Sequence, residues 1–254
     1  MNDTPQSTLR QDRRDITGMT ELLTGWIELI LAFALFFLSH IIPVRPTIRE
    51  WLIRHIGKAI YLAAYSVLSI ILFVWLIVAV GRAPYLPLWQ FAPWQKWIPN
   101  LAMPFVCLLL AFGIAAPNPL SIASRNDESF DPDRPGIAGV TRHPVLWAAA
   151  LWAIAHAVPN GNLAHVLLFG SFGAFSLVGM LAIDARKQCA LGAANWRRLS
   201  HRTSQVPLAA LVGESWRPSL REINLFRLVA AVGLYAGLLA LHQPVIGVSP
   251  FPPL

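Results

Sequence analysis

Residues 141–161 have the sequence TRHPVLWAAALWAIAHAVPNG, an apolar segment between two prolines with a histidine near each end. Pro144 suits the first turn of a helix and disfavours helical backbone at His143 before it. Pro159 blocks continuation of that helix, and the Asn-Gly pair after it favours a tight turn. At ~1.5 Å per residue, the resulting helix of about fourteen residues spans only about two-thirds of a bilayer.

The second histidine of this segment is expected inside the membrane. Because the helix starts at one membrane surface and is too short to reach the other, His156 should lie within the apolar layer and not at its edge. An ionisable group is costly there and is usually retained for a function. His156 is therefore the first candidate functional residue.

The composition is typical of a polytopic membrane protein. The chain has 254 residues, of which 56% are hydrophobic and 13% are charged, and its mean hydropathy is +0.54. Three segments contain no Asp, Glu, Lys or Arg over 19 to 21 residues: Ile60–Val80, Ile98–Ala116 and Leu163–Ile183. Each can cross the hydrocarbon as a helix, and none alternates with period two as a barrel strand would. We predict an all-α, polytopic integral membrane helix bundle with about six transmembrane helices.

Three regions are expected along the chain. Residues 1–18 are polar and are predicted to form a disordered extension, with Met19 as an alternative start. Residues 244–254 form a proline-rich tail. Residues 19–243 form the membrane domain, with helices expected over about 22–42, 60–80, 98–116, 163–183 and 225–241 and a shorter one between Pro144 and Pro159.

The net charge of +7 predicts contact with a lipid bilayer and not with nucleic acid, because the basic residues flank apolar segments. With six helices, five of the 20 Lys and Arg residues lie on the side of the two termini and fifteen on the other side. The positive-inside rule then places the large loops in the cytoplasm and both termini outside it.

His40 and His156 are the main candidate metal ligands. The positions three and four residues before each share its helix face, and they hold an alanine and a tryptophan before His156 and two phenylalanines before His40. Two neutral imidazoles with small and aromatic neighbours suit axial ligation of a haem iron. The alternative is that each imidazole donates to a backbone carbonyl and only joins helices. The predicted cofactor-binding set is His40, His156, Ala153, Trp152, Phe36 and Phe37.

Three further polar residues border the short helix. Arg142 and His143 mark its entrance, where a helix cap, a lipid-headgroup contact or catalysis would each explain them. Asn160 belongs to the turn that follows the helix. The sequence contains no P-loop, GxGxxG, CxxC pair or GxSxG motif.

Several motifs resemble those of the NnrU family, whose plant and cyanobacterial relatives are the 15-cis-zeta-carotene isomerases. The resemblance covers roughly 25–243, nearly the whole chain. The matching segments are SH (39–40), IGKAIY (56–61), GVTRHP (139–144), LWAIAH (151–156), NG (160–161), LFG (168–170) and RTSQVPLAA (202–210).

The resemblance implies a multi-pass protein of the bacterial inner (cytoplasmic) membrane that binds haem b through two histidines. Matched by motif, these are His40 and His156. It also implies a link to nitrite and nitric oxide respiration (denitrification), and possible redox or cis-trans isomerase-type activity on nitric oxide or an apolar molecule. The isomerases carry an alternative cysteine ligand three residues before the second histidine, where this chain has Ala153. The predicted topology places His40 toward the cytoplasmic side and His156 in the outer half, so the sequence leaves open whether they share one iron.

Two other functions remain open from the sequence. Arg142-His143-Pro144 before an apolar helix also resembles membrane methyltransferases of the isoprenylcysteine type, which use S-adenosylmethionine. Those enzymes have a Glu-Glu pair after the following helix, whereas this chain has Asp184 followed by Ala. The third possibility is a non-catalytic membrane assembly or regulatory factor, for which the fold alone would suffice.

Overall fold

The computed structural model describes residues 5–43, 45–125, 129–213, 216–218 and 224–252. The chain is 73% helical, and no strand occurs among the described residues. The elements are α1 (Pro5–Ile41), α2 (Pro46–Ile56), α3 (Lys58–Arg82), the 3-10 helix η1 (Pro93–Lys96), α4 (Trp97–Gly113), α5 (Ile137–Val140), α6 (Pro144–Ala157), α7 (Leu163–Ser200), α8 (Ala209–Val212) and α9 (Leu225–Ile246).

The helices confirm an all-α polytopic membrane protein. Among the described residues, five helices are long and apolar enough to cross a membrane: α1 (from Leu22), α3, the η1–α4 segment, α7 and α9. The shorter apolar helix α6 has 14 residues and begins and ends beside the prolines that predicted it. The chain divides into two compact units: unit 1 is 1–88 with 162–165, and unit 2 is 89–161 with 166–254.

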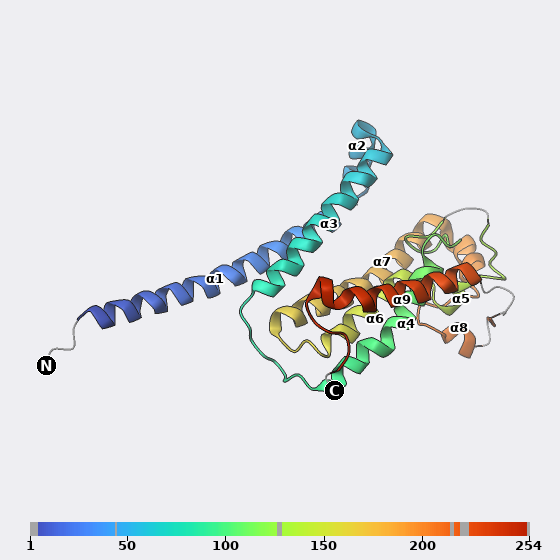
Figure 1. Ribbon diagram of the computed structural model, residues 1–254. Coiled ribbons are helices and arrows are strands. Elements are labelled where there is room, and N and C mark those ends of the chain that lie inside the picture. Colours follow the sequence, from blue (N-terminus) through green and yellow to red (C-terminus); the bar gives the residue numbers. More distant parts are fainter. Residues whose placement is uncertain (1–4, 44, 126–128, 214–215, 219–223, 253–254) are drawn as a thin grey trace. The chain divides into compact units, whose positions relative to one another are not determined.

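Unit 1 is built on the pairing of α1 with α3, which lie side by side (Figure 1). Their contact is apolar, with Leu29 and Ala32 of α1 and Leu76 and Ala79 of α3 almost fully buried. Glu28 adds a polar link, because its Oε1 accepts hydrogen bonds from Trp75 Nε1 at 3.1 Å and Arg82 Nη1 at 3.2 Å. The charge inside the predicted membrane segment is thereby paired.

Helix α1 starts earlier than its apolar segment. Composition predicts that residues 1–18 are disordered, but the helix already begins at Pro5. Extending an existing helix costs less than nucleating one, so the apolar segment supports helical residues before it. Residues 1–4 of the predicted extension lie outside the described residues.

Unit 2 is a bundle of α4, α6, α7 and α9, in which α4 packs against both α6 and α9 (Figure 1). Small residues bring α6 close to its neighbours, since Ala148, Ala150, Ala153 and Ala155 are fully or almost fully buried. An ideal Cβ placed on Gly173 of α7 would lie 3.9 Å from the Ala153 Cβ, which is ordinary contact. The alanines therefore serve as a packing surface for a helix in the middle of the bundle.

Two helices run beyond the ranges expected from the sequence. Helix α7 was expected to end at Ile183 but extends to Ser200, with non-helical backbone at Gly192 (φ 74°, ψ 158°). Helix α9 continues through Pro244 to Ile246, so it includes the first residues of the predicted tail. A helix can continue into charged sequence after its apolar part ends. Hydropathy therefore predicts the limits of the membrane span, but not the limits of the helix.

The C-terminal tail is held against the start of α4. Lys96 Nζ donates to the carbonyl oxygens of Ser249 at 2.8 Å and Phe251 at 3.2 Å. Asn100 Nδ2 donates to the Pro250 carbonyl at 2.8 Å. Residues 253–254 lie outside the described residues.

The short helix α6 decides the topology of the termini, and this can be tested. If α6 and its flanking turns complete a crossing, the number of crossings is even and Leu254 lies on the side of the N-terminus. We expect alkaline phosphatase fused after Leu254 to be active outside the cytoplasm and a green fluorescent protein fusion there to be dark. A fluorescent fusion with inactive phosphatase would mean that α6 enters and leaves on one side.

Candidate functional site

His40 is the next-to-last residue of α1 and lies in unit 1. Its Nδ1 lies 2.7 Å from the Phe36 carbonyl oxygen and 3.2 Å from Ser39 Oγ. The Phe36 ring is 4.2 Å from the imidazole between centroids, and Tyr65 of α3 lies at 5.7 Å in an edge-on arrangement. We call His40 with Phe36 and Tyr65 the His40 half-site.

Aromatic rings continue from this half-site along α1. Phe36 lies edge-on to Phe37 with centroids 5.5 Å apart, and Phe37 stacks on Phe33 at 6.2 Å. Phe73 of α3 lies 6.2 Å from Phe36. The predicted phenylalanines of α1 thus form one continuous aromatic surface with a contribution from α3.

His156 is the next-to-last residue of α6 and lies in unit 2. Its Nδ1 lies 2.8 Å from the Trp152 carbonyl oxygen. Phe169 of α7 is 5.7 Å from the imidazole and 5.3 Å from the Trp152 ring, in an edge-on arrangement with the latter. We call His156 with Trp152 and Phe169 the His156 half-site.

Ala153 and Asn160 support the His156 half-site from two directions. Ala153 is fully buried and lies against α7, so it contributes to helix packing. Asn160 Nδ2 donates to the His156 carbonyl at 2.8 Å, which satisfies a carbonyl that the helix end leaves without an intrahelical partner. The turn predicted at Asn160 therefore also fixes the last turn of α6.

The hydrogen bonds define the tautomer of both histidines. A carbonyl oxygen can only accept, so Nδ1 carries the hydrogen in His40 and in His156. No described group forms a hydrogen bond with Nε2 of either residue. A neutral imidazole with Nδ1–H bound to a carbonyl and a free Nε2 lone pair is the arrangement expected of a metal-ligating histidine.

A third polar arrangement lies at the other end of α6 and was not predicted as a unit. His143 is completely buried, and its two ring nitrogens face Ser121 Oγ at 3.0 Å and Asp184 Oδ1 of α7 at 2.9 Å. The second carboxylate oxygen of Asp184 accepts from Arg142 Nη1. We call Ser121, Arg142, His143 and Asp184 the polar cluster.

Arg142 of the polar cluster also contacts the last turns of α7 and the segment that follows this helix. The Arg142 guanidinium lies over the Trp196 ring at 4.9 Å, and its Nε donates to Thr203 Oγ1 at 3.1 Å. Trp147 Nε1 donates to the Gln205 carbonyl at 2.7 Å. The two sequence segments 139–144 and 202–208 therefore pack together. Because both ring nitrogens of His143 have hydrogen-bond partners, neither is free to bind a metal ion.

The sequence indicated Arg142 and His143 as candidates, but not Ser121 or the pairing with Asp184. One signal was present, since Asp184 is the first charged residue after 21 uncharged ones in Leu163–Ile183. A charge at the end of a membrane segment needs a partner or water. The partner could not be named from sequence, because His143 lies 41 residues away from Asp184.

The described residues contain no group of three or more His, Cys, Asp or Glu side chains that could hold a metal ion by themselves. No curated protein and no solved structure matches the chain. The family model described as NnrU protein matches residues 28–250 and includes both half-sites and the polar cluster. Since this match covers most of the sequence, the chain belongs to the NnrU family.

Proposed function

We propose that this NnrU-family protein binds haem b in the bacterial inner membrane, with His40 and His156 as iron ligands. The observation that carries the proposal is the free Nε2 of each imidazole, which the Nδ1 hydrogen bond orients away from its own helix. Aromatic neighbours on α1, α3, α6 and α7 supply the apolar surroundings that a porphyrin requires. Each half-site by itself thus offers one imidazole and the aromatic side chains that a haem face requires.

Three other histidines fit less well. His143 uses both ring nitrogens within the polar cluster, and His201 does so with Arg198 and Asp133. His55 has the same Nδ1 bond as the half-sites, to the Trp51 carbonyl at 2.7 Å. It lies on α2, which has 11 residues and buries none of them. His55 is therefore a matched control for a histidine outside the membrane segments.

The function that follows is tied to nitrite and nitric oxide respiration through the family resemblance. Haem iron held by His40 and His156 would supply a redox centre, and nitric oxide or a polyene double bond could bind to it only if one of the two histidines were released. The chain's own contribution is to orient two neutral imidazoles and to exclude water with aromatic side chains. Ala153 offers no sulfur ligand, so any exchange of ligands at the iron would involve the histidines themselves.

The test is the visible spectrum of the full-length protein, purified in detergent from haem-replete cells. We expect a Soret band and sharp α and β bands after reduction, with one haem per chain by pyridine haemochrome assay. If the two histidines bind one iron, His40→Ala and His156→Ala should each lose most of the haem. A loss of about half in each single variant would mean two separate sites and would overturn shared ligation.

Two further variants make the assignment specific. His55→Ala should keep the full haem content, because its imidazole lies outside the membrane segments. His242→Ala examines a histidine of the membrane helix α9 whose Nδ1 also lies near a carbonyl oxygen, that of Val248 at 2.7 Å. If His242→Ala removes haem while His40→Ala does not, the second ligand is His242. A colourless, folded protein would exclude haem, and S-adenosylmethionine binding should then be measured.

A further inference from the structure

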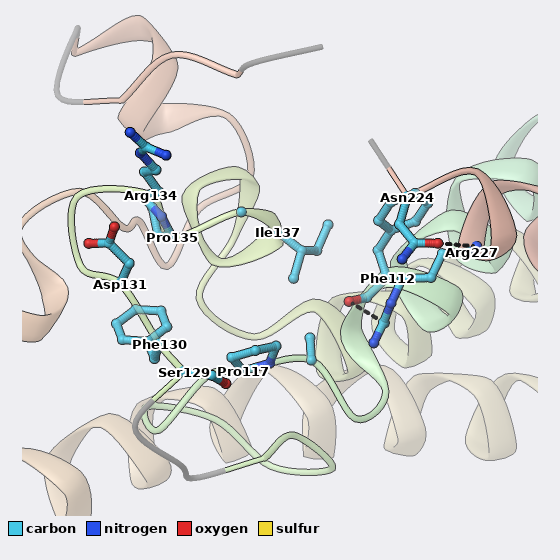
Figure 2. A pocket seen from close by; sticks show the side chains of 12 residues that line it. Phe112, Pro117, Ser129, Phe130, Asp131, Arg134, Pro135, Ile137, Asn224 and Arg227 are labelled. Carbon is cyan, nitrogen blue, oxygen red and sulfur yellow. Dashed lines mark hydrogen bonds between the residues drawn. The ribbon is translucent and has the colours of Figure 1, made fainter. Parts of the chain in front are cut away.

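Unit 2 contains a cavity of about 180 Å³ where α4 ends and α9 begins (Figure 2). Its walls come from the end of α4, the loop before α5, the start of α5 and the first turn of α9. None of its lining residues belongs to the half-sites or to the polar cluster. Aromatic, proline and arginine side chains line it, including Phe112, Pro117, Phe130, Arg134, Asn224 and Arg227.

Arg227 supplies a positive charge that is fixed in position. Its side chain caps α4, whose last carbonyls have no intrahelical partners. No acidic side chain pairs with Arg227 in the described part of the chain, so the charge is held in place without being neutralised by a carboxylate. Its Nη1 donates to the carbonyl oxygens of Ala111 at 2.7 Å, Phe112 at 3.0 Å and Ile114 at 3.0 Å, and Nη2 to that of Ala115 at 3.3 Å.

Arg134 supplies a second charge from the opposite side of the cavity. Its side chain is exposed and has no hydrogen-bond or ion-pair partner in the described residues. Asp131 is the acidic residue of the lining, and its Oδ1 accepts the backbone N–H of Asp133 at 2.9 Å. Figure 2 shows Arg134 extending from the rim clear of Asp131. Among the described residues of the lining, two arginines and one aspartate give a net positive charge.

The cavity lies at the ends of two membrane helices. Both α4, together with η1, and α9 are candidate membrane spans, so a site where one ends and the other begins is at the level of the lipid headgroups. Beside it, the first turns of α9 expose large apolar side chains: Leu225 at 70%, Phe226 at 81% and Val229 at 61%. Cationic groups at headgroup level thus adjoin an apolar helix face that acyl chains can cover.

We propose that this cavity binds the headgroup of an anionic phospholipid. The phosphodiester would take the remaining N–H donors of Arg227, because guanidinium groups match phosphate oxygens in shape and charge. Arg134, at the rim, would attract the anionic headgroup through its charge. The acyl chains would run along Leu225, Phe226 and Val229. The positive-inside prediction places this end in the cytoplasmic leaflet, where anionic lipid attracts basic groups. This inference does not rest on haem binding.

The experiment is thermal unfolding of the full-length protein in a mild neutral detergent with added phosphatidylglycerol, phosphatidylcholine or inorganic phosphate. We expect phosphatidylglycerol to raise the Tm progressively, by about 5 °C at saturating lipid, because a ligand that binds only the folded state stabilises it. Phosphatidylcholine and inorganic phosphate should leave the Tm unchanged. Higher salt should reduce the phosphatidylglycerol effect.

Arg134→Gln is the variant that tests the site, since its side chain has no protein partner and its loss should leave the lipid-free Tm unchanged. We expect about fivefold weaker apparent affinity for phosphatidylglycerol, as one interfacial arginine is lost. Arg198→Gln removes the same charge from an exposed position of α7 outside the cavity and should bind as the wild type does. The proposal would be overturned if both variants lost the same affinity for phosphatidylglycerol. It would also be overturned if both lipids shifted the Tm equally, or if inorganic phosphate alone shifted it.

Discussion

Asp184→Ala is expected to lower the free energy of unfolding by about 3–5 kcal/mol, the usual cost of removing one partner from a buried ion pair. Asp184 binds Arg142 and His143 at once, and their side chains are only 12% and 0% exposed. Without the carboxylate, a buried guanidinium and a buried imidazole N–H lose their acceptor. Thermal unfolding of the protein in detergent would show this as a large decrease in Tm.

Asp133 offers a matched control, because it also pairs with one arginine and one histidine. Its partners are Arg202 and His201, and its side chain is 68% exposed. Water replaces lost partners at such a site, so Asp133→Ala should change stability by about 1 kcal/mol at most. Equal effects of Asp133→Ala and Asp184→Ala would contradict the view that burial makes the polar cluster important.

Gly161→Ala is expected to destabilise the protein by about 2–3 kcal/mol through overpacking and lost hydrogen bonds. A Cβ at Gly161 would lie 2.7 Å from Trp89 Cδ1 and would also overlap the Trp89 carbonyl oxygen. Trp89 cannot move freely, because its Nε1 donates to the Val158 carbonyl at 2.9 Å and its backbone N–H to the Gly161 carbonyl at 3.4 Å. Thermal unfolding in detergent measures the change.

Gly173→Ala is the control for this substitution. The new Cβ would lie 3.8 Å from Ile154 Cγ1, which is ordinary van der Waals contact. Alanine is favoured over glycine inside a helix, so this variant should be as stable as the wild type or more stable by up to about 1 kcal/mol. A stable Gly161→Ala protein would mean that the turn after α6 can relax around a methyl group.

Hydropathy and local backbone rules were sufficient to predict the apolar helices, but not the short helices η1, α5 and α8. Pro144 and Pro159 bracket α6 because proline acts on the residues next to it, and this needs no information about the rest of the chain. The membrane spans were recognisable because backbone groups in hydrocarbon must be bonded within a helix, so a long uncharged segment has one solution. The start of α1 and the ends of α7 and α9 differ from the predicted limits, because each helix continues beyond its apolar segment.

Part of the candidate site could also be predicted from local sequence. The sequence by itself marked His40 and His156, since an ionisable residue in an apolar segment stands out, and the family motifs named the same pair. Their tautomers also follow from local structure, as each Nδ1 bonds to a carbonyl four residues earlier on the same helix. Periodicity likewise placed Phe36 and Trp152 beside the imidazoles.

The partners of the remaining polar residues were decided only by the tertiary structure. Asp184 meets His143 across 41 residues, Glu28 meets Arg82 across 54, and Arg227 reaches the end of α4 across more than 100. The sequence indicates that a charged residue near the membrane needs a partner. It does not identify which of the many candidate residues will lie close to that charge. That choice depends on which helix ends meet when small residues such as Ala153 let α6 pack inside the bundle, and packing is a property of the assembled helices.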